Sequence, residues 1–200
     1  MNFSFILHAC ARLSIIKYKI YCPFKRIDQN DDLPVTPMDL SHWIIDIIRH
    51  LAKTTEFMTL VNSMYEKNFL FQMFLASILL IIDFLCLFQI PVLLEHKENR
   101  KDVLDLILFI FGTFFTIYMN CYIGQRLMDY STDVYREVCL VPFHEISLKT
   151  QKLLLTTLTM SAKPYAVSIG KVYVASNEFF SNLLRTSLSF AMVVHSLQTI

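Results

Sequence analysis

Polar and apolar positions alternate in blocks along the chain, and the last block repeats with a helical period. Pro164 and Gly170 interrupt regular structure before it begins, because one lacks a backbone donor and the other loosens the chain. Six later positions follow one another at steps of 4, 3, 4, 4 and 3, an average of 3.6 residues. They are Glu178, Asn182, Arg185, Ser189, Val193 and Ser196. This pattern predicts an amphipathic helix, which either packs against a neighbour or faces water inside a membrane assembly.

Two apolar stretches are long enough to cross about 30 Å of hydrocarbon as helices. The first covers residues 68–94, and its strongly polar members are Gln72, Asp83 and Gln89. The second covers residues 103–124. A carboxylate is costly in lipid, so we expect Asp83 to face protein or water.

The stretches between these spans mix charge with apolar residues. Pro37 opens a water-exposed amphipathic helix that reaches residue 67, since proline is favoured at the first helical position. The second span continues into water after residue 124, and residues 148–160 form a short helix of their own. Residues 1–22 read as the end of a helix, and residues 23–36 read as a loop.

Composition supports a membrane protein and argues against several other classes. The chain has 200 residues, of which 54% are hydrophobic, and a net charge of +1. This charge provides no field for nucleic acid, and the five cysteines have no spacing typical of a disulfide framework or a metal site. No zinc-protease, phosphate-loop or serine-hydrolase motif is present, and the adjacent His144 and Glu145 have no further ligand. We therefore expect no catalytic residues, no metal and no cofactor.

Several short stretches, in order along the whole chain, resemble the C-terminal part of an insect odorant receptor. The segments that carry this resemblance are His8-Ala9-Cys10, Leu13-Ser14-Ile15-Ile16, the stretch 56–76, Gly124-Gln125, Ser131, Tyr135, Gln151-Lys152-Leu153-Leu154-Leu155, Lys163-Pro164, Gly170, Phe180, Leu184 and Ser187-Leu188-Ser189-Phe190. Two positions differ from the family pattern. Phe143 stands where the family usually has Trp, and Leu188-Ser189-Phe190-Ala191 replaces an aromatic-rich motif.

The resemblance implies an all-α membrane protein, a partial seven-helix insect chemoreceptor bundle with a broken last helix, that lacks the first three helices and most of the fourth. It places the chain in the plasma membrane as a multi-pass subunit. The expected segments are the end of a truncated transmembrane helix at 1–22, a cytoplasmic loop and anchor helix at 23–67, a transmembrane helix at 68–94, an extracellular loop at 95–102, a transmembrane helix at 103–124, a cytoplasmic extension and short anchor helix at 125–163, and the break with a pore-lining helix at 164–200.

The family also implies a function and the residues that perform it. Such a subunit joins an odorant co-receptor in a heterotetrameric cation channel of olfactory sensory neurons and binds volatile hydrophobic ligands. The implied pore and gate residues are Ser189, Val193, Ser196 and Leu197, with the hydrophobic constriction at Val193. The implied odorant pocket is lined by Phe84, Leu87, Phe88, Leu104, Ile107, Leu108 and Phe111.

Three alternatives stay open at this stage. A gustatory receptor of the same superfamily would share the architecture and differ in ligand, and a truncated receptor fragment would have no function. A transporter would show inverted repeats with paired broken helices, whereas only one broken hydrophobic segment is visible. The ligand itself is not readable from the residues.

Overall fold

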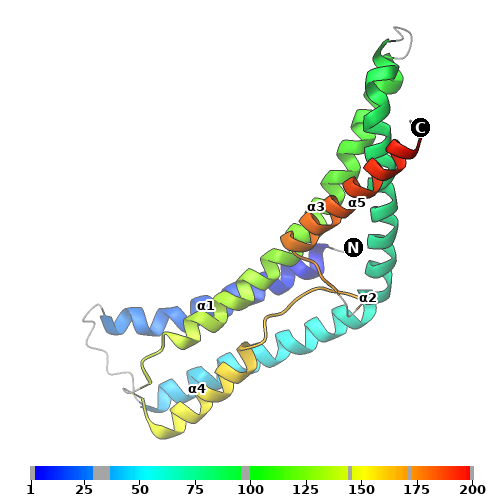
Figure 1. Ribbon diagram of the computed structural model, residues 1–200. Helices are drawn as coiled ribbons and strands as arrows, with labels where there is room; N and C mark the ends of the chain where they lie inside the picture. Colours follow the sequence, from blue (N-terminus) through cyan, green and yellow to red (C-terminus); the bar gives the residue numbers. More distant parts are fainter. Residues whose placement is uncertain (1–2, 29–36, 96–99, 144–145, 171–172, 199–200) are drawn as a thin grey trace. The chain divides into compact units, whose positions relative to one another are not determined.

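The computed structural model describes residues 3–28, 37–95, 100–143, 146–170 and 173–198. The predicted positions 96–99 of the 95–102 loop and the pair His144-Glu145 lie outside these ranges. The described elements are α1 (Phe3–Asp28), α2 (Pro37–Glu95), α3 (Arg100–Cys139), α4 (Leu148–Ser161), β1 (Ser168–Ile169), β2 (Tyr173–Val174) and α5 (Asn177–Gln198) (Figure 1). The predicted all-α class is confirmed, and the predicted break between the last two helices is present.

The chain divides into two compact units. Unit 1 contains Tyr65–Gln125 and Ser168–Ile200, and unit 2 contains Asn2–Met64 and Arg126–Val167. The long helices α2 and α3 therefore each contribute one part to either unit.

Unit 1 is built from the second part of α2, the first part of α3, the β1–β2 ribbon and α5 (Figure 1). Its core contains Leu80 of α2, Ile117 and Cys121 of α3, and Ala191 of α5, all of them buried. Aromatic pairs join the helices: the Phe84 and Phe114 rings lie 5.8 Å apart. A T-shaped pair of this kind adds to the energy of area burial alone.

Two helices in the described part of the chain are apolar and long enough to cross a membrane. The stretches are Glu66–Gln89, with a mean hydropathy of 2.4, and Val103–Cys139, with a mean hydropathy of 1.8. Only 17% of the first apolar window and 22% of the second are buried inside the protein. Apolar faces this exposed are typical of helices that meet lipid rather than of a soluble core.

Unit 2 contains α1, the first part of α2, the last part of α3, and α4. Leu13, Leu51 and Leu127 are completely buried and bring α1, α2 and α3 together. The Trp43 indole donates a 2.9 Å hydrogen bond to the Lys19 carbonyl, which joins α2 to α1. Lys17 of α1 pairs with Asp133 of α3 at 2.7 Å. In addition to this ion pair, a helix cap stabilises the unit: Ser147 caps the start of α4.

Several helix ends differ from the sequence predictions. The predicted loop at 23–36 is wrong for its first part, because α1 continues through Pro23 to Asp28. Similarly, α2 passes Pro91 and ends at Glu95, and it runs from Pro37 without a boundary near residue 67. A proline removes one hydrogen bond from a helix, and long helices with many remaining bonds tolerate this loss. The predicted start at Pro37 and the predicted continuation of α3 past residue 124 are confirmed.

The segment between α4 and α5 forms a small ribbon that the sequence did not predict. Ser168 pairs with Val174 and Ile169 with Tyr173 in antiparallel register. Gly170 at the turn has a φ of +62°, and a Cβ atom there would meet the Leu70 side chain at 2.8 Å. The positive φ favours glycine at this position, and a Cβ atom would in addition displace the end of the Leu70 side chain.

Candidate functional site

The six periodic positions of α5 share one exposed face. Glu178, Asn182, Arg185, Ser189, Val193 and Ser196 are all exposed, and Val193 is 55% accessible. On the opposite side Ser187 and Ala191 are buried, and Leu184 is half-buried. The helix thus packs through one stripe and leaves the predicted stripe exposed. Leu197, the other implied gate residue, is also exposed at 68%.

The start of α5 is fixed to α3 through the backbone. Gly124 of α3 lies so close to Ala175 that a Cβ atom at position 124 would overlap the Ala175 carbonyl oxygen and lie 2.7 Å from its Cβ. The next residue, Gln125, accepts a 3.3 Å hydrogen bond from the Asn177 amide through its side-chain oxygen. Ser176 caps the helix by accepting from the Phe179 amide at 3.1 Å. These bonds satisfy amides that the first turn of a helix leaves unpaired.

The end of α5 makes a different contact. The His195 ring lies 4.9 Å from the Phe88 ring of α2. The first turn therefore packs on α3, where Phe180 meets Tyr118 at 5.7 Å, and the last turn packs on α2. Contacts at both ends of α5 therefore fix the direction in which its exposed stripe faces within unit 1.

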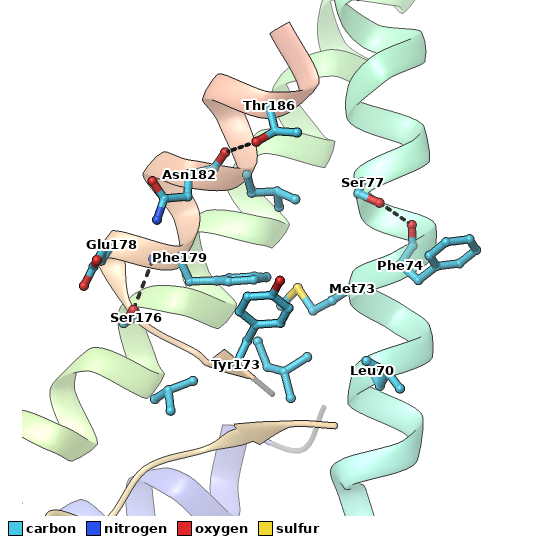
Figure 2. A pocket seen from close by; sticks show the side chains of 13 residues that line it. Leu70, Met73, Phe74, Ser77, Tyr173, Ser176, Glu178, Phe179, Asn182 and Thr186 are labelled. Atoms are coloured by element: carbon cyan, nitrogen blue, oxygen red, sulfur yellow. Dashed lines mark hydrogen bonds between the residues drawn. The ribbon is translucent and has the colours of Figure 1, made fainter. Parts of the chain in front are cut away.

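A cavity of about 610 Å³ lies between α2, the ribbon and the first part of α5. Figure 2 shows the Phe179 and Tyr173 rings turned toward Met73 of α2. The polar ends of Glu178 and Asn182 point away from α2 in the same view. The wall of this cavity is therefore mixed, and its charged lining residue, Glu178, belongs to the exposed stripe of α5.

A second hollow, the α2–α3 groove, has a volume of about 570 Å³. It is lined by Gln72, Leu75, Ala76, Leu79, Leu108, Phe109, Gly112, Thr113, Thr116 and Ile117. All ten residues belong to the two candidate spans, and two of them, Leu108 and Phe109, are more than half exposed. The groove therefore opens on the apolar face of unit 1. Its size is in the range of sites for small molecules.

Among the seven residues implied for an odorant pocket, Leu108 lines this groove. Phe84 instead packs against Phe114, Phe88 against His195, and Phe111 stacks on Phe115 of its own helix. Leu87, Leu104 and Ile107 are exposed apolar residues on α2 and α3. Their role in binding stays a prediction.

The sequence pattern named Gln72 but did not point to the other polar groups of the groove. It carried no prediction for Gly112, Thr113 or Thr116. Their spacing offered one signal, because Gly112, Thr113 and Thr116 place small or polar groups on neighbouring helical positions of one face. Asp83 was expected to face protein or water, and it is 1% exposed within unit 1.

Unit 2 holds its helices with an ion pair at the surface. Lys19 donates to Asp46 at 2.6 Å, and the His50 ring lies 3.1 Å from the same ammonium. The Lys19 hydrogen bond holds the pKa of the Asp46 carboxyl below its usual value. In the same unit, the Tyr165 hydroxyl and the Thr55 hydroxyl are 2.6 Å apart, and burial raises the pKa of this tyrosine.

Comparison with known proteins gives a family and a fold. A family model described as 7tm Odorant receptor matches residues 1–188. The solved structure of the insect olfactory receptor OR5 from Machilis hrabei, in complex with eugenol, superimposes with a TM-score of 0.68 at 13% identity. The match covers 96% of this chain and 45% of that structure, so the chain spans less than half the length of that receptor. No curated protein matches the chain.

Proposed function

Because the chain belongs to the seven-transmembrane odorant receptor family, we propose that it is a subunit of an odorant-gated cation channel in the plasma membrane. In this proposal it assembles with an odorant co-receptor into a heterotetramer and responds to volatile hydrophobic molecules. Residues 68–94 and 103–124 cross the bilayer, and α5 faces the ion path.

The observation that carries the proposal is the two-sided character of α5. Its packed stripe, with Ser187 and Ala191, holds the helix to its own subunit. Its exposed stripe begins with Glu178 and Asn182 and ends with Val193 and Ser196. A stripe of this kind suits a helix that borders water when several subunits surround one axis. An apolar ring at Val193 would close such a path by excluding water.

The ligand part of the proposal relies on the α2–α3 groove and the neighbouring apolar residues. The receptor from Machilis hrabei was solved with eugenol, a small organic molecule, and it has the same fold over the matched region. A concave apolar surface with a few polar groups is the usual form of such a site.

The test is a current measurement in cells that express the chain together with an odorant co-receptor. We expect odorants to evoke a cation current that is absent from cells expressing either protein alone. Val193→Ser is expected to raise the leak current or change ion permeation, because a polar ring admits water. Leu184→Ser, on the half-buried side, is expected to lower surface expression instead, because it buries a polar group. Odorant responses that never depend on this chain would overturn the proposal.

A further inference from the structure

The polar groups on the wall of the α2–α3 groove have a common property: their protons are already used. The Thr113 hydroxyl donates to the Phe109 carbonyl at 3.1 Å. The Thr116 hydroxyl donates to the Gly112 carbonyl at 2.8 Å. A hydroxyl has one proton, so each oxygen can offer only lone pairs to the groove. Apart from the Gln72 amide, which can both donate and accept, the side chains of the described groove therefore present acceptors.

Two buried side-chain oxygen atoms without partners extend the same rows of residues. Asp83 lies one helical turn beyond Leu79 on α2, and its Oδ2 atom has no hydrogen-bond partner. Its carboxyl group interacts with the Thr113 side chain. Asn120 lies one turn beyond Thr116, donates its amide to the Thr116 carbonyl at 2.9 Å, and leaves its Oδ1 atom unpaired. Buried acceptors without donors are costly, and an ionisable residue inside a span points to a functional site.

The groove also has room for a small molecule that enters from the bilayer. A Cβ atom at Gly112 would find nothing within 4 Å, so the wall of the groove is open at this residue. The rim is apolar and exposed, with Leu108 at 66% and Phe109 at 55%. A molecule dissolved in the hydrocarbon region would reach this opening without crossing water.

We propose that the α2–α3 groove binds a small uncharged alcohol or phenol, whose apolar body lies against Leu75, Leu79 and Leu108 and whose hydroxyl donates to Thr113. A ketone or an ester brings only a further acceptor, and an alkane leaves the acceptors unpaired. A charged amine would have to give up its hydration to enter the hydrocarbon region, so the uncharged hydroxyl is the donor that reaches the groove. This inference rests on the proposed function for the source of the ligand, and it names the ligand class that the receptor prefers.

The direct test measures binding without requiring a current. The full chain carrying Gly112→Cys is placed in lipid nanodiscs and labelled with a membrane-permeant maleimide, and labelling at position 112 is read from peptide mass. The probes are 1-octanol, 2-octanone and n-octane at equal membrane concentrations. One additional hydrogen bond corresponds to a factor of about three to ten in affinity. We expect 1-octanol to slow the labelling about threefold to tenfold more than either of the other probes.

Two matched variants locate the hydrogen bond. Thr113→Val keeps the shape of the side chain, removes its acceptor and is expected to abolish the advantage of 1-octanol. Thr132→Val, on the same helix but outside the groove, removes a hydroxyl that donates to Met128 at 2.9 Å and is expected to leave the advantage intact. Equal protection by all three probes, or an advantage that survives Thr113→Val, would overturn the inference. So would the absence of protection by any probe, which would mean that a lipid chain or another helix fills the groove.

Currents recorded in parallel separate this inference from the proposed function. Selective protection by 1-octanol without any odorant-evoked current would support the alcohol site and contradict the proposed channel function. Odorant-evoked currents without protection at position 112 would support the channel function and contradict the alcohol site.

Discussion

Gly124 and Ala175 are in direct backbone contact, and this contact fixes the start of α5 on α3. A Cβ atom at position 124 would lie 2.7 Å from the Ala175 Cβ and would overlap its carbonyl oxygen. Ala175 is itself completely buried, so it has no open side toward which it can move away from position 124. The contact is therefore the fixed point from which the exposed face of α5 extends.

The first prediction concerns this contact. Gly124→Ala forces the α3 and α5 segments apart, and overpacking of this kind costs about 1–3 kcal/mol. We expect a lower thermal unfolding temperature of the purified protein and a weaker yield of folded material. Gly112→Ala is the matched control on the same helix, because its new methyl group meets open space. Since alanine favours a helix by about 1 kcal/mol over glycine, this control is expected to be neutral or stabilising. Equal losses in both variants would show that the Ala175 contact is not the cause.

The second prediction concerns the ion pair between α1 and α2 in unit 2. Lys19 holds the pKa of Asp46 below its usual value, so the charged carboxylate is the form that stabilises the fold. The stabilisation is fully present above the unfolded pKa, which is about 4, and it is lost as the pH falls through the lower folded pKa. We expect a small effect, because both side chains are more than a third exposed.

Unfolding temperatures measured from pH 7 down to pH 3 provide the check. Asp46→Asn is expected to remove part of the acid-induced loss and to be less stable than the native chain at pH 7. The exposed Asp129 of α3 offers a comparison through Asp129→Asn. If the two variants had the same pH profile, the Lys19 pair would have no measurable role.

The third prediction concerns Tyr165, which lies between α2 and α3 in unit 2. Its amide donates to the Ser131 hydroxyl at 2.9 Å, and its own hydroxyl pairs with Thr55 at 2.6 Å. Burial raises the pKa of this tyrosine, so folding favours the neutral phenol. The stability is constant below the unfolded pKa of about 10 and falls as the pH rises through the higher folded pKa.

Unfolding temperatures at pH 8 and pH 11 measure this effect. Tyr165→Phe removes the titrating group and is expected to reduce the loss at alkaline pH, at a cost of about 1 kcal/mol at pH 8 for the missing hydrogen bond. Tyr18→Phe, at a position that is 67% exposed on α1, serves as the control and is expected to keep the native pH profile. An unchanged profile in Tyr165→Phe would contradict the assignment.

Much of the architecture follows from local signals. Pro37 opens α2, and Leu148 opens α4 behind its Ser147 cap, where proline and a capping hydroxyl predict a helix start. The period of α5 was readable, because its exposed positions are spaced by the helix itself. The ends of α1 and α2 could not be predicted from their prolines. A proline removes one backbone hydrogen bond, and the remaining bonds and contacts of a long helix outweigh that loss.

The candidate sites depend on neighbours that are distant in sequence. Gly170, at the turn of the β1–β2 ribbon, lies against Leu70, which is 100 residues earlier in the chain. The groove at Gly112 exists because nothing in the described chain fills the space beside it. The role of Thr113 depends on which carbonyl takes its proton and on the carboxyl group of Asp83. The spacing of Gly112, Thr113 and Thr116 marks one face of a helix, but nothing in composition or periodicity indicates the neighbours that these residues meet.

The last prediction tests the orientation of α5 within an assembled channel. Single cysteines replace Ser189, Val193 and Ser196 on the exposed stripe, and Leu184 and Ala191 on the packed stripe, in a background without other reactive cysteines. A charged, water-soluble thiol reagent reaches only side chains in contact with water. We therefore expect the three stripe positions to react and to alter the odorant-evoked current, and the two packed positions to stay unmodified.

The reason for this expectation is geometric. Ala191 is completely buried and Leu184 is half-buried against the rest of unit 1, whereas Val193 is 55% exposed and is two residues from Ala191 in sequence. Two residues along a helix correspond to a turn of about 200°, so the two side chains lie on opposite sides. An exposed stripe that faced lipid instead of water would give no reaction at 189, 193 or 196, because the charged reagent does not enter hydrocarbon. Reactivity at 184 and 191 equal to that at 193, without a period of about 3.6 residues, would mean that α5 does not border the ion path.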